Sequence, residues 1–241
     1  MFDPFGDFDT HGYLRNSEGE KDLGIIKIVE HELFRAQLPS ALNFLAQCKV
    51  ITYDDFLEVH RILFSALYPW AGNDRNVLMP DRFISKGKVY FCHPRDCRRA
   101  IEEGLSFAQQ RQKMAIQPGF VMGMFAYGHP FLDGNGRTML IVHAELCFRA
   151  NISIDWMRTN KDLYLRALTR EIEEPHAGFL DQYLQTFIGA KTLRERWMES
   201  LSILPGLDGS NVDLNSSAEY TDPGIAENYQ AFERRRAYKL A

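Results

Sequence analysis

The segment from His129 to Arg137 carries chemical groups that suit the handling of a polyphosphate. It combines a histidine, a carboxylate, a Gly-Asn-Gly backbone and an arginine: His129, Asp133, Gly134, Asn135, Gly136 and Arg137. An imidazole titrates near neutrality, so His129 is a candidate general base. Asp133 offers hard oxygen ligands suited to a Mg²⁺ ion that bridges phosphates. Arg137 offers a fork of donors to one phosphate group.

This segment is predicted to be a loop between two buried helices. Apolar residues recur at helical spacing on both sides of it, at Phe120, Val121, Met124 and Phe125 and at Met139, Val142, Leu146 and Ala150. The Gly-Asn-Gly run then falls at the start of the second helix, where free N–H groups and the helix dipole favour an anion. A lone histidine or a lone Gly-Asn-Gly turn usually has only a structural role, but these residues in this order at a helix start favour a phosphate-binding site. The missing Gly-Lys-Ser/Thr ending excludes a P-loop.

The same run resembles the signature of a known family. Residues 129–137 resemble the Fic signature His-Pro-Phe-x-Asp/Glu-Gly-Asn-Gly-Arg, with every defined position matching. Residues 84–94 resemble the β-hairpin flap that borders the Fic active site, and residues 68–72 are also similar to that family. The resemblance covers about residues 10–190 and implies a mainly α fold, a Fic-type helical domain with a small β-hairpin flap.

The resemblance also implies an activity. Fic proteins resembling this one transfer AMP from ATP to a Ser, Thr or Tyr hydroxyl of a target protein, so the chain is expected to be a nucleotidyltransferase with ATP as substrate and Mg²⁺ as cofactor. His129 would be the base, Asp133 the metal ligand, and Gly134, Asn135, Gly136 and Arg137 the phosphate-binding residues. The flap would dock the main chain of the target as an added strand, through Lys86, Gly87, Lys88, Val89 and Tyr90.

One position departs from the family pattern. Many AMP-transferring members have a second arginine three residues after the first, and here that position is Leu140. In the family this arginine helps to hold the terminal phosphate of ATP and pairs with an inhibitory glutamate. Another nucleotide or a phosphodiester donor is therefore an alternative to ATP. A non-catalytic nucleotide-binding regulatory module is a further alternative, although binding alone does not require His129.

The inhibitory motif of the family, Ser/Thr-x-x-x-Glu-Gly/Asn, is only half present. Glu18, Glu103 and Glu227 are each followed by Gly or Asn, but none has a hydroxyl residue four positions earlier. A glutamate facing Leu140 would be a buried charge without compensation, which is costly. We therefore expect that no glutamate of this chain holds the site shut. An inhibitory, antitoxin-like partner is the alternative form of restraint.

Composition limits the remaining classes of function. The chain has 241 residues, 45% of them hydrophobic, and a formal charge of −4, which gives no general reason to expect nucleic-acid binding. It shows neither a secretory leader nor an apolar run long enough to span a bilayer, so no membrane contact is expected. Four scattered cysteines fit a reducing compartment. A cytoplasmic location is predicted, and delivery into another cell is compatible with this sequence.

The positions of proline, glycine and polar turn residues, which end helices and strands, predict three parts of the chain. They are an irregular N-terminal arm (1–20), a Fic domain (21–200), and a linker with a C-terminal helix (201–241). A helix over 22–37 is predicted to stop at Pro39, and Thr52 with Asp55 predicts a capping box that opens another. Lys86-Gly87 is expected to turn between strands 82–84 and 89–91. Further helices are expected over 179–188 and 226–240, and a loop over 205–217.

Overall fold

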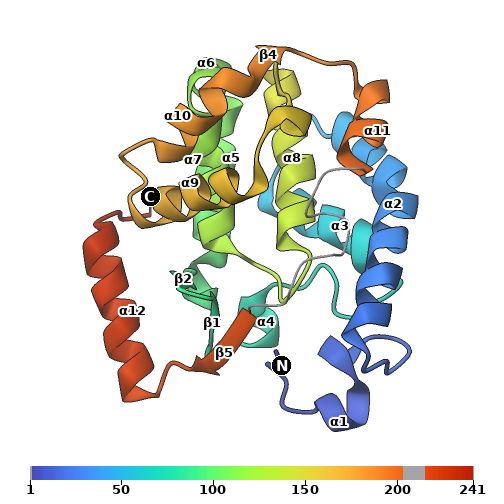
Figure 1. Ribbon diagram of the computed structural model, residues 1–241, viewed down its shortest axis with the longest axis vertical. Helices are drawn as coiled ribbons and strands as arrows, with labels where there is room; N and C mark the ends of the chain where they lie inside the picture. The colour runs from blue at the N-terminus through green and yellow to red at the C-terminus, as the bar shows by residue number, and fades with distance from the viewer. Residues whose placement is uncertain (1, 203–214, 241) are drawn as a thin grey trace.

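Helices dominate the fold of this chain, as the family resemblance predicts (Figure 1). The structure is a computed structural model that describes residues 2–202 and 215–240. The α-helices are α1 (Phe8–His11), α2 (Leu23–Gln47), α3 (Tyr53–Phe64), α4 (Arg75–Leu78), α5 (Cys97–Gln109), α6 (Arg111–Ile116), α7 (Pro118–Gly128), α8 (Asn135–Arg149), α9 (Lys161–Glu173), α10 (Phe179–Leu184), α11 (Trp197–Ser202) and α12 (Pro223–Arg236).

Five short strands accompany these helices. They are β1 (Arg82–Lys86), β2 (Val89–Tyr90), β3 (Ile152–Ile154), β4 (Ile188–Ala190) and β5 (Asn215–Glu219). Strands β2, β1 and β5 form one antiparallel sheet in that order, and β3 pairs with β4. The hairpin between β1 and β2 lies where the sequence predicted a flap.

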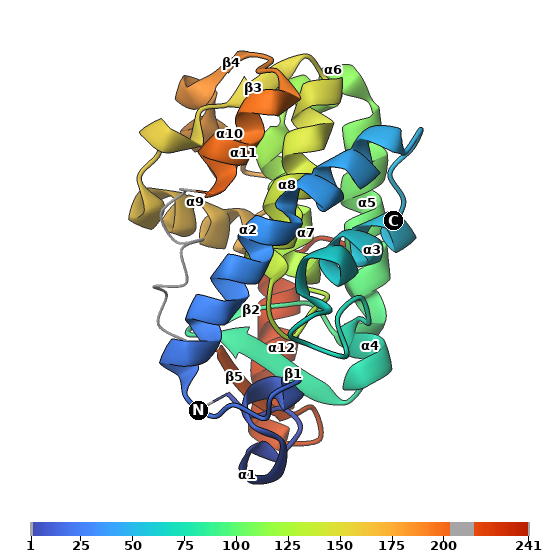
Figure 2. The same cartoon turned by 90° about the vertical axis from the view of Figure 1, so that its right-hand side faces the viewer.

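The core of the domain is built around α7 and α8. Every residue of α7 is buried, and α8 stands beside it in the middle of the molecule (Figure 1). Helix α5 approaches α7 so closely that a Cβ at Gly104 would lie 2.8 Å from the ring of Phe125. Helices α2 and α3 cover α8 from another side (Figure 2). The loop between α7 and α8 is therefore fixed at both ends by buried helices.

The predicted end of the first long helix is wrong. Helix α2 continues through Pro39 and ends at Gln47. Proline removes one backbone hydrogen bond and crowds the preceding turn, which costs about 3 kcal/mol in a helix interior. Apolar residues on both sides of the proline are buried in the core, at Phe34, Leu38, Ala41, Leu42 and Leu45. Tertiary packing on both sides of Pro39 outweighs the local penalty.

The predicted helix start at Thr52 is confirmed. The Thr52 side chain accepts from Asp55 N–H, and the Asp55 carboxylate accepts from Thr52 N–H, which completes the capping box of α3. The helix ends at Phe64.

The two ends of the chain are more ordered than the sequence indicated. The N-terminal arm contains α1 and a 3₁₀ turn over Tyr13–Arg15, and Phe2, Tyr13 and Leu14 belong to the core. The expected loop over 205–217 lies mostly outside the described residues, but its last three residues are in β5. The expected C-terminal helix is present as α12. The helix expected over 179–188 ends earlier, at Leu184, and Ile188 begins β4.

Candidate active site

The loop between α7 and α8 begins with a strained turn at His129. Helix α7 ends at Gly128, and His129 follows with φ 39° and ψ 56°, in the left-handed region that non-glycine residues rarely adopt. Such strain persists only where surrounding contacts fix the backbone. Here the His129 N–H donates to Phe125 O, and the imidazole stacks on the ring of Phe91 at 3.6 Å between centroids.

The imidazole of His129 is held in its neutral form. Burial is the main cause that moves its pKa well below the usual value, and the positive charges of Arg75 and Lys86 add to this effect. A neutral imidazole has a free lone pair at pH 7 and can accept a proton. His129 is therefore suited, by its charge state, to the base role that the sequence assigned to it.

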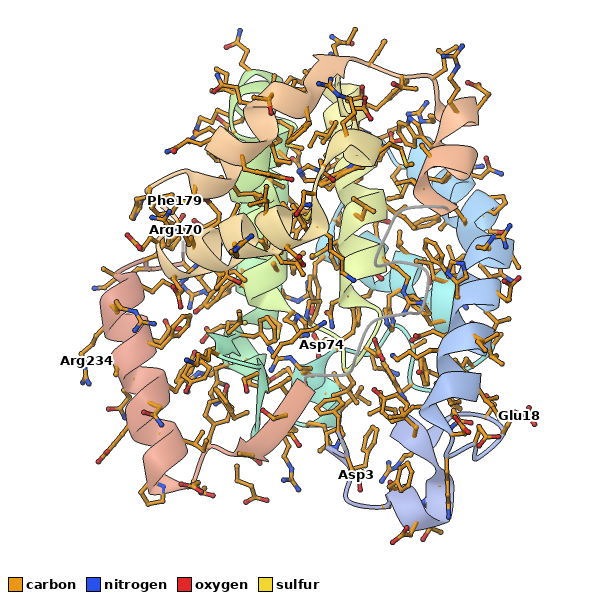
Figure 3. The ribbon with its side chains drawn as sticks, in the orientation of Figure 1. Asp3, Glu18, Asp74, Arg170, Phe179 and Arg234 are labelled. Atoms are coloured by element: carbon orange, nitrogen blue, oxygen red, sulfur yellow. The ribbon has the colours of Figure 1, made fainter. Side chains whose placement is uncertain are left out.

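Arg75 fixes the turn that carries His129. Its side chain is fully buried, and its guanidinium donates to His129 O at 2.7 Å, Cys92 O at 3.0 Å and Gly128 O at 3.3 Å. Its main-chain N–H donates to Pro130 O at 2.7 Å. Sequence reasoning did not identify this residue, because nothing in its local pattern indicates that it is buried. It follows Asp74, which caps α4 and lies inside the molecule (Figure 3).

His60 supports the loop from α3. Its Nδ1 accepts from Gly72 N–H at 3.0 Å, so its Nε2 carries the proton and donates to Asp133 O at 3.0 Å. The ring stacks on Phe131 at 3.6 Å. Burial lowers the pKa of His60 to about 3, so it stays neutral. His60 is thus a buried residue that supports the loop.

The start of α8 has the geometry of an anion site. Gly134 has φ +76°, and a Cβ there would lie 2.6 Å from Phe64 and 3.0 Å from His60 Nε2, so only glycine fits. At Gly136 an added Cβ would meet no atom within 4 Å. Asn135 uses its side chain inside the loop, since its amide accepts from Phe131 N–H and donates to Phe131 O. The group of Asn135 that remains available to a ligand is its main-chain N–H in the first turn, which has no partner within the helix.

Asp133 and Arg137 belong to a chain of buried charges that the sequence did not reveal. Lys27 Nζ lies 2.7 Å from Asp133 Oδ2 and 3.3 Å from Glu30 Oε2, and Glu30 Oε2 lies 2.8 Å from Arg137 Nη2. We call Lys27, Glu30, Asp133 and Arg137 the ionic tetrad. Two of its members come from α2 and two from the signature loop and helix. It carries two positive and two negative charges, so it is neutral as a whole.

Each charge of the tetrad is maintained by its neighbours. Burial alone would raise the pKa of Asp133, but Lys27 and Arg137 lower it far below its usual range. Burial would likewise lower the pKa of Arg137, but Glu30 and Asp133 raise it. The guanidinium of Arg137 also lies over the rings of Phe64 and Phe34, at 4.7 and 5.8 Å from their centroids. Asp133 and Arg137 therefore both carry their charges.

The contact of Glu30 with Arg137 bears on the expectation that no glutamate holds the site shut. Of the glutamates weighed from the sequence, Glu18 lies on the outside of the molecule (Figure 3). Glu30 was not among them, because it is followed by His31 rather than by Gly or Asn. Its Oε1 is buried without a hydrogen-bond partner. A glutamate therefore reaches the signature arginine without the family motif, a contact that the expectation did not foresee.

The residues present do not fit a bound metal ion in this arrangement. Asp133 Oδ2 faces the ammonium of Lys27, and Asp133 Oδ1 accepts from Gly134 N–H at 2.7 Å. Among residues 2–202 and 215–240, no group of three His, Cys, Asp or Glu side chains could hold a metal ion. Asp133 is where the sequence placed the metal ligand, but a cation of the protein itself is at that carboxylate.

The flap has a strand of the same chain on one of its edges. Strand β1 pairs with β2 on one side and with β5 on the other, where Arg82 lies opposite Glu219 and Lys86 opposite Asn215. The Ser85 and Ser216 hydroxyls are 2.7 Å apart. The expectation that the whole hairpin edge from Lys86 to Tyr90 is free is therefore wrong at Lys86, whose strand is paired on both sides. Lys86, Gly87 and Lys88 are exposed residues, and Val89 and Tyr90 are half-buried.

The segment after β5 is anchored to the flap by aromatic contacts. Tyr220 stacks on His93 at 4.3 Å between ring centroids, and the main-chain N–H of His93 donates to the Tyr229 hydroxyl at 2.9 Å. Phe232 packs against Tyr90 at 5.6 Å. Figure 1 shows β5 beside β1, with α12 continuing upward past the hairpin. The C-terminal segment thus forms part of the surroundings of the site.

The amino-acid sequence is similar to a family model and to two adenylyltransferase-named proteins. Residues 50–147 match the model of the Fic/DOC family. The chain is 27% identical, over 68% of its length, to protein adenylyltransferase VbhT of Bartonella schoenbuchensis, of which the match covers 35%. It is 26% identical, over 50% of its length, to the probable protein adenylyltransferase y4lH of Sinorhizobium fredii, of which the match covers 65%. The chain thus spans about a third and about two thirds of the lengths of these relatives.

Solved structures share the fold. The N-terminal Fic domain of a putative cell filamentation protein from Bartonella quintana, with bound ADP, has a TM-score of 0.60 and 20% identity; the match covers 77% of this chain and 94% of that one. The BepC protein of Bartonella tribocorum, with bound AMPPNP, has a TM-score of 0.58 and 18% identity, covering 73% and 92%. The signature loop, the flap, the family model and the shared helical fold agree: this chain contains a Fic/DOC family domain, matched over residues 50–147.

Proposed function

We propose that this chain transfers AMP from ATP to a Ser, Thr or Tyr hydroxyl of a target protein. The observation that carries the proposal is the placement of a neutral His129, fixed by Arg75, in the loop that leads into the N-terminus of α8. The names of the two relatives, which are adenylyltransferases, support the same reaction. Two solved structures with the same fold contain bound AMPPNP and ADP, which supports a nucleotide donor.

The reaction would use the site in a defined order. The hydroxyl of the target gives its proton to His129 and attacks the α-phosphorus of the donor, and the bond from that phosphorus to pyrophosphate breaks. The N–H groups of Asn135 and Gly136 at the start of α8 and the guanidinium of Arg137 hold the phosphates and stabilise the charge on the leaving group. Gly134 lets the backbone come close to the phosphates, but its own N–H donates to Asp133 Oδ1. Asp133, the expected ligand for Mg²⁺, is paired with Lys27 in this arrangement, so no step is assigned to a metal ion here.

The identity of the donor rests on weaker support than the type of reaction. Leu140 is 7% exposed and packs in the core at the position where many relatives have a second arginine. With one guanidinium fewer, a donor with less charge than a triphosphate is the second candidate. The test is incubation of the protein with a cell lysate and a panel of labelled donors, ATP among them. Label in protein from one donor identifies it; label from none, in folded protein, contradicts the proposal.

We also propose where the protein acts and what restrains it. Among the described residues no helix is both long and apolar enough to cross a membrane. We place the reaction in the cytoplasm, either of the producing cell or of a cell into which the protein is delivered. The two Bartonella proteins with this fold are VirB-translocated effector proteins, which supports the second possibility. An inhibitory partner of the antitoxin kind remains part of the proposal, and no nucleic acid is involved.

Replacing Arg137 and Glu30 should change donor binding in opposite directions. Arg137→Ala removes the phosphate ligand, so the donor should bind at least ten-fold more weakly. Glu30→Gln keeps the shape of the side chain but removes the negative charge that lies 2.8 Å from Arg137, so the donor should bind more tightly. The measurement is the dissociation constant of ATP by isothermal titration calorimetry. Weaker binding in both variants would show that Glu30 supports the site and does not compete with phosphate.

The flap is proposed to dock the target as an added strand. Since β5 pairs with β1, the edge of the sheet open to a target within the described strands is that of β2, at Val89 and Tyr90, unless β5 moves away. Val89→Pro removes a main-chain donor at this edge and should reduce target modification several-fold, while ATP affinity changes little. Label transfer and ATP titration check the two quantities separately. Ala218→Pro in β5 is the matched variant, and a gain in target modification there would show that targets use the edge of β1.

A further inference from the structure

Two buried cysteines lie next to each other beneath the end of the flap. Cys92 lies just after β2, Cys97 begins α5, and their sulfur atoms are 3.8 Å apart. Both thiols are free, and both residues are 0% exposed. A disulfide bond is about 2.0 Å long, so the sulfurs would have to approach each other by about 1.8 Å. Rotation of the two side chains covers a movement of this size.

The pair lies one layer below the surface of the protein. The chain between the two cysteines is a short turn, in which the Arg95 side chain is 74% exposed and His93 and Asp96 are half-buried. A small oxidant therefore needs only a local opening of this turn to reach the sulfurs. The proposed transfer makes no use of either thiol.

The surroundings favour a thiolate at one of the two sulfurs. Burial alone would raise the pKa of Cys97, but the neighbouring Cys92 thiol and the charge of Arg75 lower it below its usual value. Arg75 Nη2 is 3.4 Å from Cys97 Sγ. Burial raises the pKa of Cys92, so Cys92 keeps its proton. Cys97 is thus suited to attack an oxidant, with a second thiol beside it.

We propose that Cys92 and Cys97 are a peroxide-sensitive thiol pair, and that closing it to a disulfide slows catalysis at His129. The Cys97 thiolate attacks one oxygen of hydrogen peroxide and the O–O bond breaks, which gives a sulfenic acid at Cys97 and releases hydroxide. The Cys92 sulfur then attacks the sulfenic sulfur and the S–O bond breaks. The departing hydroxide takes the Cys92 proton and leaves as water. The two sulfurs lose two electrons, which the peroxide gains.

The disulfide would change two contacts at the turn that carries His129. In the thiol form, Cys92 Sγ lies 3.3 Å from Gly128 O, to which it can donate, and Arg75 Nη2 contacts Cys97 Sγ and Gly128 O together. A disulfide sulfur has no proton for Gly128 O and no charge for the guanidinium. Because the left-handed turn depends on surrounding contacts, the imidazole should lose its orientation. That effect on catalysis rests on the proposed function, whereas formation of the disulfide does not.

Trypsin separates the two cysteines, so the disulfide can be detected directly in the wild-type protein. Cleavage after Lys88, Arg95 and Arg98 gives the peptides 89–95 and 96–98, each with one cysteine. The reduced full-length chain is treated with hydrogen peroxide, the remaining thiols are blocked with N-ethylmaleimide in denaturant, and the digest is analysed by mass spectrometry. The two peptides should appear joined, and dithiothreitol should separate them. Absence of the joined peptide at every peroxide concentration that leaves the protein folded overturns the proposal.

Single variants assign the roles of the two sulfurs. In Cys92→Ser the sulfenic acid at Cys97 has no thiol to react with, so it should persist and be trapped by dimedone. In Cys97→Ser, Cys92 should stay unlabelled. Cys48 and Cys147 are internal controls, because burial raises the pKa of both, and Cys48 is more exposed than the pair. Label on Cys48 before Cys97, or equal label on Cys92 in Cys97→Ser, contradicts the proposal.

The effect on catalysis is measured on one wild-type sample before and after oxidation. Peroxide treatment should lower the transfer rate about ten-fold or more, since a small displacement of a catalytic group costs much of its effect. Dithiothreitol should restore the rate, and the rate of Cys97→Ser should not respond to peroxide. A joined peptide with an unchanged rate overturns the link to His129. Failure of every donor to label protein would reject the proposed transfer alone, because the joined peptide is detected without donor or target.

Discussion

His129→Ala is expected to abolish transfer while the fold and donor affinity persist. The imidazole is the group in the signature loop that can take a proton at neutral pH, and a general base contributes about 10²–10⁴-fold to a rate. The phosphate ligands proposed here, Arg137 and the first turn of α8, are other residues and are left intact. Transfer should therefore fall by at least about 10²-fold. The measurement is the initial rate of label incorporation into target protein at saturating donor.

The control for this variant is His176→Ala. His176 is exposed and contacts Tyr238 near the C-terminus, with ring centroids 4.9 Å apart. Its loss should leave the rate unchanged. Because the ring of His129 stacks on Phe91, thermal melting must accompany the assay. Wild-type transfer in a folded His129→Ala protein would remove the base role; loss of melting cooperativity would show that the histidine supports the fold instead.

The pH dependence of the rate follows from the lowered pKa of His129. Burial, with Arg75 and Lys86, keeps the imidazole neutral well below pH 6.5, the usual midpoint for histidine. The base form therefore persists as pH falls through 6.5, and activity is lost only at lower pH, where the ring takes a proton. The rate should be flat between pH 8 and 6. A midpoint near 6.5 in the free enzyme would show that the ring is exposed to solvent before the target binds.

Local signals in the sequence predicted the parts of this structure that depend on neighbouring residues. The capping box at Thr52 joins residues three positions apart, and the flap hairpin closes around Gly87. The signature loop likewise begins α8 where the Gly-Asn-Gly run indicated. Each of these features is fixed by hydrogen bonds within a few residues. Such contacts leave a pattern that can be read along the chain.

The features that were missed depend on contacts between distant residues. Lys27 and Asp133 are separated by 106 positions, and Ser85 and Ser216 by 131. Neither pair leaves a local signal, since Lys27 and Glu30 look like solvent-facing charges of a helix. Pro39 was misjudged for a related reason, because the packing that keeps α2 continuous comes from elements far away in sequence. The chemistry of the site was readable from the loop, but its internal counter-charges were not.

Arg75→Leu should destabilise the protein and slow transfer more than any substitution outside the signature loop. The guanidinium supplies the donors for His129 O, Gly128 O and Cys92 O, at 2.7, 3.3 and 3.0 Å. Leucine fills part of the volume but donates nothing, and each buried carbonyl left without a partner costs roughly 1–3 kcal/mol. The free energy of unfolding should fall by about 3 kcal/mol or more. Urea denaturation followed by circular dichroism measures this loss.

The effect of Arg75→Leu on the transfer rate distinguishes the role of Arg75 in stability from its role in orienting His129. His129 has a strained, left-handed backbone, and its carbonyl is fixed by the shortest of the guanidinium contacts. Without that contact the turn can relax and the imidazole loses its orientation, so the turnover rate should fall at least ten-fold under conditions where the variant is folded. Donor affinity should change little, because Arg137 and the first turn of α8 are not in contact with Arg75. Arg95→Leu is the matched control, with a side chain that is 74% exposed, and it should leave both stability and rate unchanged. A stable Arg75→Leu protein with normal turnover would mean that the turn at His129 is fixed by its helices alone.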